Sequence, residues 1–286
     1  MTTFTAACVQ NCADRDPGPS MAALGDLIRQ ARDAGGDLIM TPEVCAMLEP
    51  RRKLGREKAQ FEEANDALET FRELARETGA WLLIGSMAIK IEGEERLANR
   101  SILLDPNGET QARYDKIHMF DVNVDEGNSF RESNGYRPGE AGTLVETPWG
   151  GLGMTVCYDM RFPYLYRDLA KAGADFLAMP SAFTVPTGRA HWHVLLRARA
   201  IENGCFVFAP AQTGEHAEGR KSYGHSLIVD PWGEVLADAG EDVGVVTAEI
   251  EVSKVAEARG RVPSLYNDRS YSAPKPLAKV HPQAAE

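Results

Sequence analysis

FTAACV, at Phe4–Val9, is an apolar run that predicts a β-strand and begins the pattern that decides the fold class. A helix is expected next, with Ser20 as its N-cap and apolar residues at helical spacing at Met21, Leu24, Leu27, Ile28 and Ala31. Asp37–Met40 predicts a short buried strand. That strand ends at Thr41 and Pro42, because proline removes a backbone donor from the sheet.

The alternation of strand and helix then repeats. A second helix is expected to end at Gly79, with one apolar face formed by Phe61, Ala64, Leu68, Phe71 and Ala75. Trp81–Ile84 predicts the following strand. An order of strand, helix, strand, helix, strand indicates an α/β protein in which helices pack on a sheet.

Two D-P-x-G turns, at 105–108 and 230–233, predict β-hairpins in the rest of the chain. Proline at the second and glycine at the fourth position are typical of a type I turn. Further strands and helices are expected between the hairpins, at Gly151–Val156, Phe162–Ala172, Asp175–Met179, Arg189–Asn203 and Cys205–Pro210. No Pro-, Gly- or Ser-rich linker divides the chain, so one domain is expected over residues 1–271, with an arm at 272–286. Asp121–Glu140 is the best candidate for a long functional loop.

Composition excludes several classes of protein. The 286 residues carry 31 Lys and Arg against 42 Asp and Glu, a formal net charge of −11. This balance disfavours nucleic acid and anionic membranes as partners, although a pocket can still bind a small anion. The five cysteines form no disulfide pattern, and neither a signal peptide nor an apolar run of about 18 residues is present. We therefore expect a reduced, cytoplasmic protein.

Three reactive side chains come directly after predicted strands. They are Glu43, Lys116 and Cys157. Because open α/β sheets bind ligands beyond the carboxyl ends of their strands, these three can meet as a base, an electrostatic stabiliser and a nucleophile for acyl transfer. Cys157 also precedes a helix N-terminus, which favours a thiolate. Taken singly, a core cysteine, a surface glutamate and a solvated lysine are equally ordinary interpretations.

The segments around these residues resemble the three catalytic motifs of the nitrilase, or carbon–nitrogen hydrolase, superfamily. They are TPE at 41–43, YDKIHMFD at 114–121 and GMTVCYDMRFP at 153–163. PTGRAHWH at 186–193, SYGHS at 222–226 and DPWG at 230–233 resemble the Nit branch, and the deaminated-glutathione amidases more than the omega-amidases. The resemblance runs from Phe4 to about Tyr271 and implies an α-β-β-α sandwich, a four-layer α/β fold, that forms homodimers.

The resemblance also implies roles for single residues. Glu43 would act as general base, and Cys157 would attack the amide carbonyl. Lys116 and the backbone N–H of Tyr158 would stabilise the oxyanion, ammonia would leave, and water would hydrolyse the thioester. Glu132 matches a second family glutamate that would hold Lys116 and orient the substrate amide. No cofactor is implied.

Substrate contacts are predicted beside the nucleophile. The Arg161 guanidinium suits a carboxylate, and Phe183 and Thr184 are expected along the pocket wall, against an α-keto acid end. An ion pair between Arg161 and Asp159 is the structural alternative. The small-molecule substrate would be a carboxylate-bearing amide such as deaminated glutathione. An omega-amide of an α-keto dicarboxylate and an N-carbamoyl amino acid remain alternatives.

Other functions are weighed against this one. His191, His193, His216 and His225 could suggest zinc, but no cysteine or acid completes a recognisable spacing, so no metal is expected. A protease-like dyad of Cys157 with His118 or His191 lacks the local signatures of thiol proteases. Arg51, Arg52 and Lys53 are expected to be solvated surface charges. A non-catalytic interaction protein on this fold would have a broken catalytic position, and none is broken here.

Overall fold

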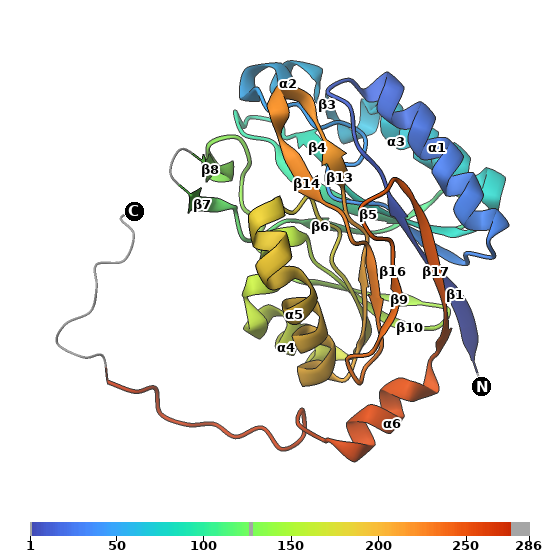
Figure 1. Cartoon of the computed structure of the whole chain (residues 1–286), viewed down its shortest axis with the longest axis vertical. Coiled ribbons are helices and arrows are strands. Elements are labelled where there is room, and N and C mark those ends of the chain that lie inside the picture. Colours follow the sequence, from blue (N-terminus) through green and yellow to red (C-terminus); the bar gives the residue numbers. More distant parts are fainter. Residues whose placement is uncertain (1, 126–127, 276–286) are drawn as a thin grey trace.

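The computed structural model describes residues 2–125 and 128–275, which form two facing β-sheets covered by helices (Figure 1). The first sheet has the order β17-β1-β2-β4-β5-β6, with the short β3 beside β4. Strands β1, β2 and β4 are parallel. The bounds in this sheet are β1 Thr3–Gln10, β2 Leu38–Met40, β3 Gln60–Phe61, β4 Trp81–Lys90, β5 Ala98–Leu104, β6 Thr110–Asp115 and β17 Gly244–Glu251.

The second sheet has the order β16-β15-β12-β11-β10-β9. Its centre is parallel and its edges are antiparallel. The bounds are β9 Thr143–Thr147, β10 Gly150–Met154, β11 Ala174–Ala178, β12 Phe206–Ala209, β15 Leu227–Val229 and β16 Val235–Asp238. Both predicted D-P-x-G hairpins are present, joining β5 to β6 and β15 to β16.

Helices cover the outer face of each sheet. The helices α1 (Pro17–Asp33) and α3 (Asp66–Thr78) pack on the first sheet, and α4 (Pro163–Ala172) and α5 (Val185–Asn203) pack on the second (Figure 1). The remaining elements are α2 Arg52–Lys58, α6 Ser253–Arg261, the pairs β7 Asp121–Asp125 with β8 Asn128–Arg131 and β13 Thr213–Glu215 with β14 Lys221–Tyr223, and the 3₁₀ turns η1 Glu62–Ala64, η2 Glu132–Asn134, η3 Cys157–Arg161 and η4 Ala217–Gly219. None of the helices within the described ranges is both long and apolar enough to cross a membrane.

Alternating side chains of β1 show why the layers stack in this order. Phe4, Ala6 and Cys8 face the core between the sheets, whereas Ala7 and Val9 face the core under α1 and α3. Phe4 stacks on Trp149 with ring centroids 4.4 Å apart. Because β1 is buried on both faces, its residues Phe4–Val9 form a continuous apolar run in the sequence. The predicted α-β-β-α sandwich is confirmed.

Two boundaries near the first helices differ from the predictions. Helix α1 begins at Pro17, where a proline needs no backbone donor, so Ser20 lies inside it and its hydroxyl bonds Asp14 instead of capping. The second helix is α3, and the side chain of Asn65 caps it by accepting a hydrogen bond from Leu68 N at 2.9 Å. Phe61 therefore lies outside the helical face, in the edge strand β3, and Ala64 lies in η1.

Two other regions carry predictions about function and domain limits. The loop expected over Asp121–Glu140 contains the pair β7 and β8 followed by η2, which carries Glu132. Residues 126–127 of that loop lie outside the described part. The domain boundary after residue 271 stays a prediction. Of the expected arm, 272–275 are exposed and 276–286 lie outside the described residues.

Candidate active site

Glu43 lies in a tight connection directly after β2. Thr41 continues the sheet through its N–H, which donates to Leu83 O at 2.9 Å, and Val44 then takes a left-handed backbone conformation with φ +47°. Gly85 of β4 passes so close that a Cβ there would lie 2.0 Å from Thr41 O. The strained turn aims the Glu43 carboxylate toward the second sheet, where Glu43 Oε2 accepts a hydrogen bond from Ala182 N at 2.9 Å.

Lys116 is held between two glutamates in the interior. Its Nζ donates to Glu43 Oε1 at 2.8 Å and to both Glu132 oxygens, at 3.0 and 2.8 Å, while its side chain is only 2% exposed. Asn99 Nδ2 bridges the same carboxylates, at 2.9 Å to Glu43 and 3.1 Å to Glu132. Phe120 N donates to Glu132 Oε2 at 2.7 Å. The structure thus brings together the lysine and both predicted glutamates, with an asparagine that the sequence reasoning missed.

Cys157 begins the η3 turn beyond β10 in a left-handed conformation with φ +50°. Its backbone N–H donates to Pro180 O at 2.9 Å, which fixes the turn against the loop after β11. Tyr158 is the next residue, so its N–H has no partner within the turn. The side chain of Cys157 is buried beside Glu43 and Lys116.

The protonation states of these neighbours are set by burial and by charge. Burial raises the pKa of the Cys157 thiol, and the Glu43 carboxylate raises it further, against the opposing effect of Lys116. Burial also acts to raise the pKa of Glu43, but Lys116, together with bonds from Cys157 and Asn99, holds it below its usual value. Burial lowers the pKa of Lys116 less than Glu132 and Glu43 raise it. At neutral pH these shifts favour a thiol beside a carboxylate, which is the pair that general-base action of Glu43 on Cys157 requires.

Asp159 ties the nucleophile turn to the lysine segment. It is fully buried, and its Oδ2 accepts hydrogen bonds from Val156 N at 2.9 Å and Tyr114 Oη at 2.7 Å. Its Oδ1 accepts one from His118 N at 3.0 Å. Tyr114 and His118 flank Lys116 in the chain, so one carboxylate fixes the positions of both Cys157 and Lys116. The alternative in which Asp159 pairs with Arg161 is wrong, because Asp159 bonds these other groups.

A cavity of about 340 Å³ opens above Cys157, Glu43 and Lys116. Phe183 and Thr184 line it as expected. Arg161 is not among the described residues that line it; the Arg161 guanidinium lies over the Phe183 ring at 5.5 Å and contacts His191 Nδ1 at 3.2 Å. Its role in binding a carboxylate, like the catalytic and binding roles of the other site residues, stays a prediction.

The cavity has cationic lining residues that the sequence reasoning missed or treated as solvated surface. Arg52 and Arg56 come from α2, Arg131 from β8 and Arg220 from the turn before β14. Arg220 is half-buried and forms no ion pair within residues 2–125 and 128–275. No local motif distinguishes these arginines, because only the folded chain brings them to one opening.

A protease-like dyad does not fit the geometry around Cys157. Both ring nitrogens of His118 are engaged elsewhere, Nδ1 with Asp159 at 2.7 Å and Nε2 with Tyr164 Oη at 3.0 Å. The His118 ring also stacks on Phe162 with centroids 3.6 Å apart. His191 contacts Arg161. The base that lies beside the thiol is Glu43.

Known proteins have similar sequences and similar folds. The model of the carbon–nitrogen hydrolase family matches residues 5–260. A Yersinia enterocolitica protein named deaminated glutathione amidase is 40% identical over all of both chains. The NitFhit protein of Caenorhabditis elegans superposes with a TM-score of 0.88 at 37% identity, over 93% of this chain and 65% of that one. Nit3 of Saccharomyces cerevisiae, a member of branch 10 of the nitrilase superfamily, gives 0.83 at 27% identity over 91% and 94%. With two sheets, a buried Glu-Lys-Cys cluster and these matches, the chain belongs to the carbon–nitrogen hydrolase family.

Proposed function

We propose that this protein is an amidase that hydrolyses deaminated glutathione, or a closely related α-keto acid amide, through a thioester on Cys157. The observation that carries the proposal is the buried cluster of Glu43, Lys116 and Cys157, which lines one cavity. Glu43 lies beside the Cys157 thiol, and the raised pKa of that thiol together with the lowered pKa of Glu43 suits a base that accepts the proton as sulfur attacks the carbonyl carbon.

Each half-reaction uses the same groups. The S–C bond forms while Glu43 takes the thiol proton, and the C–N bond breaks as Glu43 passes that proton to the leaving amine. A water molecule then gives a proton to Glu43 and attacks the thioester, and the thiol recovers its proton as the acid leaves. Lys116 and the free N–H of Tyr158 face the oxyanion in both steps.

The leaving group depends on the substrate. The expected release of ammonia applies to a primary amide. Deaminated glutathione is a secondary amide, so its leaving group is the amine of a dipeptide. That substrate carries carboxylates at both ends. Besides the buried lysine, four arginines line the cavity, together with Glu49 and Glu95. Of these arginines, Arg220 forms no ion pair within the described residues, so it is suited to bind the second carboxylate of such a substrate.

The test is hydrolysis of three substrates by the purified protein. We expect the highest kcat/KM with deaminated glutathione, followed by α-ketoglutaramate and N-carbamoyl amino acids, measured by release of the keto acid or of the free amine. Carbon dioxide released with ammonia would instead identify an N-carbamoyl amidohydrolase. Turnover of none of the three would favour the non-catalytic alternative.

Arg220→Gln tests the recognition of the far carboxylate. We expect KM for deaminated glutathione to rise about 10- to 100-fold, because a charge-assisted hydrogen bond contributes about 1.5–3 kcal/mol. The kcat should change little, and a short neutral amide should be unaffected. Lys221→Gln is the matched control, because Lys221 is the adjacent cation, is exposed and pairs with Glu215 at 3.2 Å. An equal effect on both substrates would contradict a role in carboxylate binding.

We also propose that the protein is a cytoplasmic homodimer that binds neither nucleic acid nor membranes. All five cysteines are free, which suits a reducing compartment.

The dimer is supported by exposed apolar side chains. Val194 and Ile201 are 68% and 53% exposed on α5, and Trp232, whose neighbour Gly233 packs against Ile201, is 50% exposed. Exposed apolar side chains of this kind are often covered at subunit interfaces. Light scattering should give twice the 31.3 kDa chain mass, and Val194→Glu should shift the protein to monomer. A monomeric wild type would contradict the dimer.

A further inference from the structure

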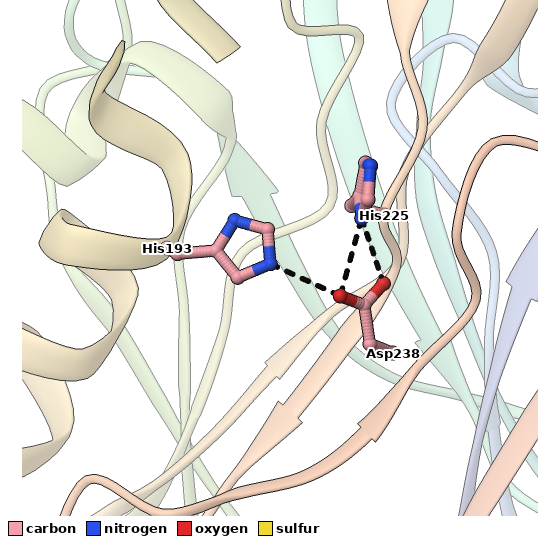
Figure 2. Close-up of side chains that lie close together, drawn as sticks. All are labelled: His193, His225 and Asp238. Carbon is pink, nitrogen blue, oxygen red and sulfur yellow. Dashed lines mark hydrogen bonds and ion pairs between the residues drawn. The ribbon is translucent and has the colours of Figure 1, made fainter. Parts of the chain in front are cut away.

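His193, His225 and Asp238 converge at a second place, separate from the cavity of Cys157 (Figure 2). His193 Nε2 lies 3.0 Å from Asp238 Oδ2, and His225 Nδ1 lies 2.9 and 3.1 Å from the two carboxylate oxygens. All three donor atoms fall within 4.8 Å of one another. None of the three residues is among the described residues that line the catalytic cavity.

Three different elements supply these side chains. His193 lies in α5, His225 in the turn between β14 and β15, and Asp238 at the end of β16. His193 and Asp238 are 45 residues apart, and no standard ligand spacing joins them. The expectation of no metal depended on the lack of an acid near the histidines, and folding supplies that acid.

The surrounding backbone holds the cluster in place. His225 has a left-handed φ of +57°, its N–H donates to Gly240 O at 2.6 Å, and its carbonyl accepts from Trp192 Nε1 at 2.7 Å. Gly240 N donates to Asp238 Oδ1 at 2.9 Å, and the Tyr223 ring stacks on His225 with centroids 4.6 Å apart. Such fixed donors lose little conformational freedom when they bind a ligand.

We propose that His193, His225 and Asp238 bind a divalent transition-metal ion, with Zn²⁺ as the best fit. Two imidazole nitrogens and one carboxylate oxygen are donors that Zn²⁺ prefers, in a tetrahedral site with bonds of about 2.0–2.2 Å. That geometry places ligand atoms about 3.4 Å apart. Each imidazole nitrogen would therefore move a few tenths of an ångström away from Asp238, and the two imidazole nitrogens, which lie within 4.8 Å of one another, would adjust to the same spacing. The three side chains are 20–36% exposed, which leaves a fourth position for water.

Proton exchange accompanies binding. Without metal, each imidazole can donate an N–H to Asp238. With metal, the same nitrogens present lone pairs, so a neutral imidazole moves its proton to the other ring nitrogen and a protonated one releases a proton.

The ion would join α5 to the turn before β15 and to β16. Helix α5 begins at Val185, directly after the cavity residues Phe183 and Thr184. A metal at this cluster therefore stabilises the helix whose start forms the wall of the active site. Since the ion binds the folded chain, thermal stability should rise with its free concentration.

Zinc titration of chelator-treated protein tests the proposal, with calorimetry and thermal melting as readouts. The wild type should bind one equivalent of zinc. His193→Gln and His225→Asn should each lower the affinity for that zinc at least about tenfold and remove the zinc-dependent rise in melting temperature. Asparagine is chosen at position 225 because it tolerates a left-handed backbone. Asp238→Asn keeps the acceptor for Gly240 and should act likewise.

His191→Gln is the matched control, because His191 lies two residues before His193 on the same helix but outside the cluster. It should bind zinc as the wild type does. Zinc bound at Cys157 would be insensitive to all four variants, so the two sites are distinguished. A wild type that takes up no zinc, or that loses none of it in His225→Asn, would overturn the proposal.

Discussion

Cys157→Ala should reduce amide hydrolysis by about 10⁴-fold or more, because it removes the only atom that forms the acyl bond. The methyl group fits the space left by the thiol, so the melting temperature should stay close to that of the wild type. Turnover of deaminated glutathione and thermal unfolding measure the two expectations. Cys8→Ala is the matched control, because Cys8 is also buried in the core between the sheets but is not among the described residues that line the catalytic cavity.

Glu43→Gln tests the role of the general base independently of the nucleophile in the same assay. It should keep Cys157 in place while it removes the proton acceptor, at a cost of about 10²–10⁴ in kcat. Wild-type-like turnover in either variant would disprove the cysteine mechanism. Because the pKa of Glu43 is lowered, the wild type should keep an ionised base when the pH falls to the usual glutamate value.

Lys116→Met should produce the largest loss of stability, about 3–5 kcal/mol in the free energy of unfolding. The lysine is 2% exposed and lies 2.8 Å from carboxylate oxygens of both Glu43 and Glu132, so its removal leaves two buried carboxylates without a cation. Methionine has a similar volume, so the effect reflects charge more than packing. Denaturant unfolding at neutral pH measures it.

The pH dependence of that loss provides a sharper test. In the wild type the lowered pKa of Glu43 contributes stability above its unfolded value, and this contribution is lost only as the pH falls through the folded pKa. In Lys116→Met, burial acts on Glu43 without the opposing charge and raises its pKa above the unfolded value. The protonated Glu43 is then tolerated in acid, and stability is lost as the pH rises and Glu43 ionises. The difference in free energy of unfolding between wild type and Lys116→Met should therefore become smaller as the pH is lowered from about 7 to about 5. A constant difference would assign the loss to packing.

Lys58→Met is the control for removing a lysine from an ion pair. Lys58 also contacts two acids, Asp16 at 2.8 Å and Glu49 at 3.1 Å, but its side chain is 25% exposed. Lys58 is partly solvated, and Glu49 keeps Arg15 and Arg51 as partners, so this variant should lose much less stability than Lys116→Met.

The sequence by itself determined the order of the elements and the identity of the central reactive residues. Apolar runs such as Phe4–Val9 and the two D-P-x-G turns are local signals, because strand and turn preferences depend on neighbours in the chain. Glu43, Lys116 and Cys157 could be selected because each follows a strand and lies in a recognisable motif. Helix starts were less certain, as Ser20 shows, since Pro17 already satisfies the first turn.

Only the tertiary structure decided how distant residues act on one another. Lys116 and Glu43 are 73 residues apart, and the pairing of strands in the first sheet, which contains both β2 and β6, brings them to 2.8 Å. Packing of the second sheet against the first buries Cys157, and this burial raises the pKa of its thiol, an effect that its place before a helix does not reveal. Tertiary packing likewise brings Arg220 to the cavity and Asp238 to His193 and His225. Burial and long-range contact set these properties, and neither is encoded in any single segment of the chain.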